Sequence, residues 1–147
     1  MTMTIAHIDS SQALAVIRIG LGLYWLSNGI RDFQIGRHKD MSKFLPMMAN
    51  ENRIAWYGQF MRVAVVPYGD FFGYFIHISM LLMGISLIVG VWTVVALIGG
   101  IVLCVNVLFA FGFGKERPQL ALLLFTEVAL LLANSEGALS LSKVLHL

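Results

Sequence analysis

The sequence predicts an all-α integral membrane protein of one domain, a four-helix bundle with a long loop between helices 1 and 2. The chain of 147 residues is 59% hydrophobic and only 12% charged, whereas soluble domains are about 25% charged. Between Asp70 and Lys115 it contains no Asp, Glu, Lys or Arg. This run of about 44 residues is roughly twice the 20 apolar residues that cross a bilayer core.

The charge-free run contains its own break. Gly90 is followed by a β-branched and aromatic cluster that includes Trp92. The pattern predicts two membrane helices in a tight hairpin, 71–89 and 93–113. Trp92 would then lie at headgroup level, where aromatic side chains gather.

Two further helices flank the hairpin. The first is expected over 13–30, with Arg18 as its only charge, and the last over 119–133, with Glu127 inside it. Segment 34–66, between the first helix and the hairpin, mixes prolines, charges and aromatic residues. We expect a long loop there that lies in the membrane interface.

Basic residues predict the orientation of the chain. Four spans place both termini on one side and the loops 31–70 and 114–118 on the other. These loops hold most of the Lys and Arg, namely Arg31, Arg37, Lys39, Lys43, Arg53, Arg62, Lys115 and Arg117. The positive-inside rule then predicts cytoplasmic loops and outer termini, in a multi-pass protein of a prokaryotic cytoplasmic (inner) membrane.

Charged residues inside the predicted spans are expected to face the bundle. Helical phase puts Arg18 on one stripe with Gly22, Trp25, Gly29 and Asp32. Arg18 and Glu127 fall at similar depth, so a buried ion pair between them is expected, because pairing lowers the cost of a charge in hydrocarbon. A purely structural pair is the simpler interpretation, and a functional one stays open.

A second polar set consists of His77 and Asn106, which lie at matching depth across the hairpin. They could hydrogen-bond to each other and hold the two helices together. Alternatively, His77 could donate to a quinone carbonyl or join a proton path. Glycines on the helix faces allow close helix packing, namely Gly22, Gly29, Gly73, Gly84 and Gly99.

Several classes of site are not expected. The net charge of +2 without a basic block gives no sign of nucleic-acid binding, and the single cysteine, Cys104, excludes an internal disulfide. His77 is the only histidine inside a predicted span, so a two-ligand haem is not expected. We predict no catalytic residue and no metal site, because neither a nucleophile motif nor metal-ligand spacing is present.

Three segments resemble the DoxX/DoxD-like family of small membrane proteins. They are RIGLGLYWLSNGIRDF at 18–33, LLMGISLIVG at 81–90 and GALSLS at 137–142. The resemblance implies a four-helix membrane bundle; some members are similar to a small subunit of thiosulfate:quinone oxidoreductase, and others occur in redox or sulfur-stress assemblies. Met80 stands where the family often has a glutamate, and Ser142 replaces its closing aspartate.

Two functions follow from these features. The favoured one is an accessory or structural subunit of a larger membrane redox complex, whose expected partners are the lipid bilayer and the other membrane subunits of that complex. The alternative is a quinone-reactive subunit of an oxidoreductase, with quinone held by one of the two polar sets, which requires a tunnel from lipid to that set. A small transporter is less favoured, because the sequence shows no broken helix.

Overall fold

The computed structural model of the chain describes residues 10–111 and 117–133, and every regular element in these ranges is helical. The all-α prediction is therefore confirmed for this part of the chain. The elements are α1 (Ser10–Gln34), α2 (Arg37–Glu51), α3 (Ala55–Phe60), the π-helical turn η1 (Met61–Val65), the 3-10 turn η2 (Val66–Tyr68), α4 (Gly69–Val89), α5 (Thr93–Ala110) and α6 (Arg117–Leu132).

Within the described ranges, three helical segments are long and apolar enough to cross a membrane. They are Ser10–Gln34, Ala55–Val89 (which runs from α3 through α4) and Thr93–Ala110. The fourth predicted span corresponds to α6, whose 16 residues extend only about 24 Å, less than the roughly 30 Å of a bilayer core. By length and composition the structure thus supports three of the four predicted spans.

The predicted loop over 34–66 is wrong, because most of this segment is helical. Gly36, with φ 75°, turns the chain between α1 and α2. The buried residues of α2 are His38, Leu45 and Ala49. Their spacing of seven and four residues is one face of a helix, and α2 continues through Pro46.

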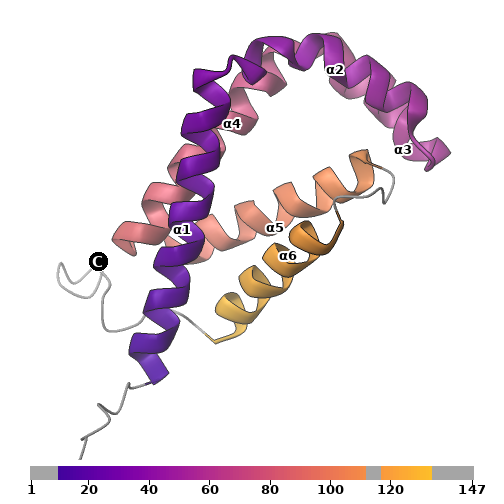
Figure 1. The fold of residues 1–147 in the computed structure, drawn as a ribbon. Helices are drawn as coiled ribbons and strands as arrows, with labels where there is room; N and C mark the ends of the chain where they lie inside the picture. The colour runs from indigo at the N-terminus through magenta and orange to yellow at the C-terminus, as the bar shows by residue number, and fades with distance from the viewer. Residues whose placement is uncertain (1–9, 112–116, 134–147) are drawn as a thin grey trace, which may run out of the picture.

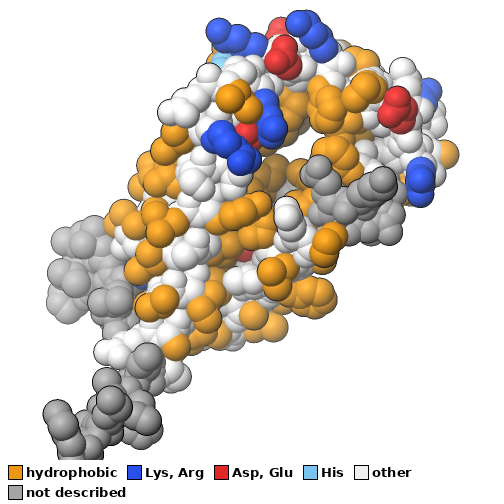
Figure 2. Space-filling view, in the orientation of Figure 1, with side chains coloured by type: hydrophobic (Ala, Val, Ile, Leu, Met, Phe, Trp, Pro, Cys, Tyr) orange, Lys and Arg blue, Asp and Glu red, His pale blue; other side chains and the backbone are white. Residues whose placement is uncertain are grey.

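The helices form two antiparallel pairs rather than an evenly packed four-helix bundle. Figure 1 shows α1 beside α4 and α5 beside α6, with α2 and α3 forming an arch at one end. The most extensive contact is between α1 and α4, whereas α1 touches α6 only narrowly. In Figure 2 charged side chains gather along the arch, and apolar side chains cover the helices below it.

The predicted hairpin between α4 and α5 is confirmed. Gly90, with φ 78°, ends α4, and its N–H donates to the Ser86 carbonyl at 2.8 Å. The Ser86 hydroxyl donates to the carbonyl of Val91 and closes the turn. Trp92 adopts φ 54°, rare for a bulky residue, and its side chain is 77% exposed.

Glycines bring α1 and α4 into backbone contact. A Cβ added at Gly84 would lie 2.7 Å from the Leu26 nitrogen and 2.9 Å from the Gly22 carbonyl oxygen. A Cβ at Gly29 would lie 2.8 Å from Leu81 Cδ2. Close packing of this kind is how small residues join membrane helices, and here it acts within the chain.

Candidate functional site

A cavity of about 1180 Å³ lies between α2, α4 and α5. Small-molecule pockets usually measure about 300–1,000 Å³ and are mostly apolar. Most of this wall is apolar as well, with side chains that include Met41, Phe44, Phe72, Phe75, Met83 and Leu103. The space is therefore large enough for an amphipathic molecule with a hydrocarbon tail.

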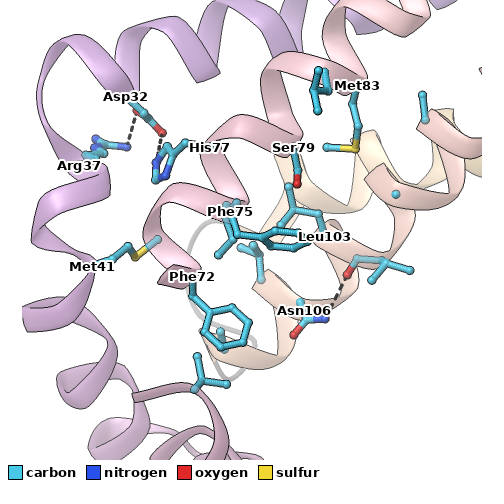
Figure 3. A pocket seen from close by; sticks show the side chains of 18 of the residues that line it. Asp32, Arg37, Met41, Phe72, Phe75, His77, Ser79, Met83, Leu103 and Asn106 are labelled. Atoms are coloured by element: carbon cyan, nitrogen blue, oxygen red, sulfur yellow. Dashed lines mark hydrogen bonds and ion pairs between the residues drawn. The ribbon is translucent and has the colours of Figure 1, made fainter. Parts of the chain in front are cut away.

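One end of the cavity is polar, and its residues come from three helices (Figure 3). Asp32 lies near the end of α1, Arg37 begins α2, and His77 lies in α4. The Asp32 Oδ1 atom is 3.3 Å from Arg37 Nη1, and the Oδ2 atom is 3.6 Å from His77 Nε2. The carboxylate thus joins three helices at the cavity wall.

Both ring nitrogens of His77 have partners. The ring is almost completely buried, and Nδ1 is 2.6 Å from the Gly73 carbonyl oxygen one turn earlier in α4. The face of α4 that carries His77 is the buried one, since Gly73, Met80, Gly84 and Leu87 are all buried with it.

A second histidine packs behind this cluster. His38 is buried, and its ring centroid lies 6.3 Å from that of His77 and 4.8 Å from those of Phe33 and Tyr74. The Nδ1 atom of His38 has no hydrogen-bond partner within the described ranges. The sequence placed His38 in a loop, and its role as a buried neighbour of the site was missed.

Asn106 provides a second polar group in the cavity wall. It lies off the buried face of α5, and its Oδ1 atom accepts a 2.7 Å hydrogen bond from the Tyr57 hydroxyl of α3. Its Nδ2 atom donates to the Val102 carbonyl at 3.4 Å. The predicted hydrogen bond between His77 and Asn106 is therefore wrong, because each side chain pairs elsewhere, although both line the same cavity.

The other predicted polar set is buried where α1, α5 and α6 meet. Arg18 and Glu127 both have 0% exposure, which confirms that neither faces lipid. The Glu127 Oε1 atom accepts a 2.9 Å hydrogen bond from Trp25 Nε1. The partner of Glu127 Oε1 is thus the indole of Trp25. The ion pair between Arg18 and Glu127 stays a prediction.

Gly100 makes room for the Glu127 carboxyl group. A Cβ at Gly100 would lie 2.8 Å from Glu127 Cδ, too close for a side chain on α5. The Glu127 Oε2 atom is buried with no hydrogen-bond partner among the described residues. This cluster is separate from the cavity, because neither residue belongs to the cavity wall.

The sequence placed Asp32 on an inward-facing stripe but did not identify it as a residue of the candidate site. It lies on the predicted inward stripe of α1, and it is indeed buried with Arg18, Gly22, Trp25 and Gly29. Because α1 and α4 run antiparallel, the end of α1 meets the first half of α4, where His77 lies.

The cluster can donate hydrogen bonds and hold a proton beside an apolar space. Among the described residues no group of three or more His, Cys, Asp or Glu side chains is arranged to hold a metal ion. Comparisons of the chain with models of protein families, with characterised proteins and with solved structures found no match. The DoxX/DoxD-like resemblance stays a prediction, and its third segment, 137–142, lies outside the described residues.

Proposed function

We propose that this chain binds a quinone-type molecule in the cavity between α2, α4 and α5, as a subunit of a larger membrane redox complex. The observation that supports this proposal most is the combination of a mostly apolar cavity with a polar cluster at one end, in which Asp32 and His77 are buried and Arg37 is exposed. A quinone combines the same two properties, a headgroup with hydrogen-bond acceptors and a long apolar tail. We place the chain in a prokaryotic inner membrane with the arch of α2 and α3 at the cytoplasmic side.

Donors in the cavity wall suit a carbonyl-bearing headgroup. Arg37 carries up to five N–H groups, and the Asn106 amide has a second N–H besides the one that contacts Val102. In the view of Figure 3, Phe75 and Leu103 are seen between His77 and Asn106. An aromatic headgroup would find apolar surface between polar contacts, which is how small-molecule sites fix orientation.

A cavity-filling variant tests the proposal. Ser79 lies in the cavity wall, whereas its neighbour Ile78 points away from it and is exposed. We expect Ser79→Phe to weaken binding of a short-chain quinone by about tenfold or more, which is about 1.4 kcal/mol. The matched control, Ile78→Phe, should bind like the unmodified chain.

Binding can be followed by quenching of tryptophan fluorescence in nanodiscs, with a decyl-tailed benzoquinone as the probe. Trp92 lies in the cavity wall and serves as a reporter. Saturable quenching whose midpoint Ser79→Phe shifts to at least about tenfold higher quinone concentration, and Ile78→Phe leaves unchanged, supports the proposal. Quenching that does not saturate, or that is equal in all three proteins, rules it out.

An accessory subunit without a ligand is the second candidate function. Large apolar side chains project outward from α6, whose described residues are too few to cross a bilayer. These side chains are Leu122, Phe125 and Leu132. This surface favours coverage by a neighbouring subunit. Both candidate functions place the chain in a larger complex. Extraction in mild detergent, native electrophoresis and mass spectrometry test for that complex, and migration of the chain as a lone small band would exclude it.

A further inference from the structure

The side-chain amide of Asn106 is held in one orientation by two neighbours. Its Nδ2 atom lies 3.4 Å from the Val102 carbonyl oxygen, one turn earlier in α5, and its Oδ1 atom lies 2.7 Å from the Tyr57 hydroxyl. A carbonyl oxygen only accepts hydrogen bonds, so the amide nitrogen is the atom that faces Val102. The amide oxygen therefore faces Tyr57, and the tyrosine hydroxyl donates to it.

Tyr57 is itself fixed by its surroundings. Its side chain is buried, and its ring centroid lies 5.8 Å from that of Phe60 and 5.6 Å from that of Phe109. The hydroxyl also lies 3.3 Å from the Asn106 backbone oxygen, but the 2.7 Å to Oδ1 is the usual O–H···O distance. Because the last side-chain torsion of asparagine is broad, the amide needs such a rigid partner to keep one orientation.

This orientation leaves a hydrogen-bond donor in the cavity wall. Nδ2 carries two N–H groups, and the Val102 carbonyl accepts one of them. Asn106 and Tyr57 both line the cavity, as do Met61 and Val65 of the π-helical turn η1 that follows α3. Such π-helical turns occur frequently at functional sites. The second N–H of Asn106 is therefore available to an acceptor bound in the cavity.

We propose that Asn106 donates a hydrogen bond to one carbonyl oxygen of the bound headgroup, and that Tyr57 is the positioning residue that keeps the amide a donor. This inference rests on the proposed quinone function and names the contact that orients the headgroup. Arg37 is a second donor in the wall, and in the view of Figure 3 it and Asn106 lie on opposite sides of Phe75. The two carbonyl groups of one headgroup therefore meet different surroundings.

The role of Tyr57 follows from what its hydroxyl prevents. Without this donor the Asn106 amide can turn about its last side-chain torsion and present its oxygen to the cavity. An amide oxygen that faces a quinone carbonyl makes no hydrogen bond, because both atoms only accept. A chain that lacks the Tyr57 hydroxyl should therefore hold the headgroup in two states, one with the hydrogen bond to Asn106 and one without it.

Infrared spectroscopy of a bound decyl-tailed benzoquinone tests this inference with the full chain in nanodiscs. The probe is made with ¹³C in one carbonyl or the other, so that each stretching band can be assigned. In the unmodified chain we expect one band to lie lower than in empty nanodiscs, because a hydrogen bond weakens the C=O bond. Asn106→Leu should remove this shift and weaken binding by about two- to tenfold, as expected for the loss of one hydrogen bond.

Two tyrosine variants separate positioning from a merely structural role. Tyr57→Phe should split the shifted band into a shifted and an unshifted component. Tyr68→Phe is the matched control, because Tyr68 is exposed and lies outside the cavity wall, and it should leave the band unsplit. A loss of folded protein would lower the amount of bound quinone without changing the position of its bands.

The outcomes distinguish this inference from the proposed function. Saturable binding with both carbonyl bands at their positions in empty nanodiscs overturns the inference and keeps the function, even if no variant folds. A shift that persists in Asn106→Leu assigns the donor to another group and also overturns the inference alone. A single, fully shifted band in Tyr57→Phe overturns the positioning role of Tyr57. The absence of saturable binding to the unmodified chain overturns both the function and the inference.

Discussion

The indole Nε1 of Trp25 lies 2.9 Å from Oε1 of Glu127, and this hydrogen bond joins α1 to α6 across 102 positions of sequence. Both side chains are buried, and α1 and α6 otherwise share only a narrow contact. In an apolar interior an unsatisfied carboxyl oxygen costs more than it does in water. This hydrogen bond therefore connects the two helix pairs, and its loss should lower the free energy of unfolding.

Replacing Trp25 should destabilise the chain. Trp25→Phe removes the donor and leaves Glu127 Oε1 without it, for which we expect a loss of roughly 1–3 kcal/mol. Trp56→Phe is the control, because Trp56 is largely exposed. Unfolding of the purified protein in mixed micelles measures both. Equal stability of the two variants would show that the hydrogen bond contributes little.

The glycine contact between α1 and α4 gives a second prediction. Gly84→Ala should cost about 1–3 kcal/mol, because the added Cβ meets the backbones of Leu26 and Gly22. Gly20→Ala should not destabilise, since nothing lies within 4 Å of the added Cβ and alanine favours the helix. The midpoint temperatures of the two variants decide this. A Gly84→Ala protein as stable as Gly20→Ala would contradict the packing.

Two of the acidic residues near the arch, Asp32 and Asp40, should differ in their effect on stability. Asp32 is buried and contacts Arg37 and His77, so Asp32→Ala should cost roughly 1–3 kcal/mol. Asp40 and Lys43 form an exposed pair, and such pairs contribute at most about 1 kcal/mol. Asp40→Ala should therefore stay close to the unmodified chain. Denaturant titration compares the stabilities of the two variants. A larger loss in Asp40→Ala than in Asp32→Ala would contradict the role of Asp32 as the stabilising carboxylate.

Much of the fold could be predicted, because membrane helices leave a strong signal. The charge-free run and the break at Gly90 indicated the hairpin, and the period of α1 identified its inward stripe. The α2 helix was missed because Pro46 and many charges suggested a loop, although the buried spacing of Leu45 and Ala49 is helical. Local composition outweighed periodicity in that interpretation, and the structure shows that periodicity was the better guide.

The candidate site was harder to predict. His77 and Asn106 were identified as polar groups in apolar helices, but their partners Asp32 and Tyr57 depend on how α1 and α3 cross the hairpin. A cavity depends on the angle between the two helix pairs, and no single helix encodes that angle. The partner of Glu127 at Oε1 was missed for a related reason, since Trp25 was placed on the inward stripe of α1 without a role as a donor.

Chemical labelling tests the helical nature of α2. Cysteines introduced at Lys43 and Asn50, which are exposed, should react with a water-soluble maleimide, whereas those at Leu45 and Ala49 should be protected. The native Cys104 is fully buried, so it should add little background. Uniform labelling through this segment would favour the loop that the sequence suggested.

The most direct test of the central claim is photolabelling with an azido-quinone in nanodiscs, followed by peptide mass spectrometry. The account predicts labels on cavity-wall residues of α4 and α5, such as Phe72, Phe75 and Leu103, which excess unlabelled quinone removes. Labels spread over outward-facing residues of α1, such as Val16 and Leu23, and insensitive to competition would contradict it.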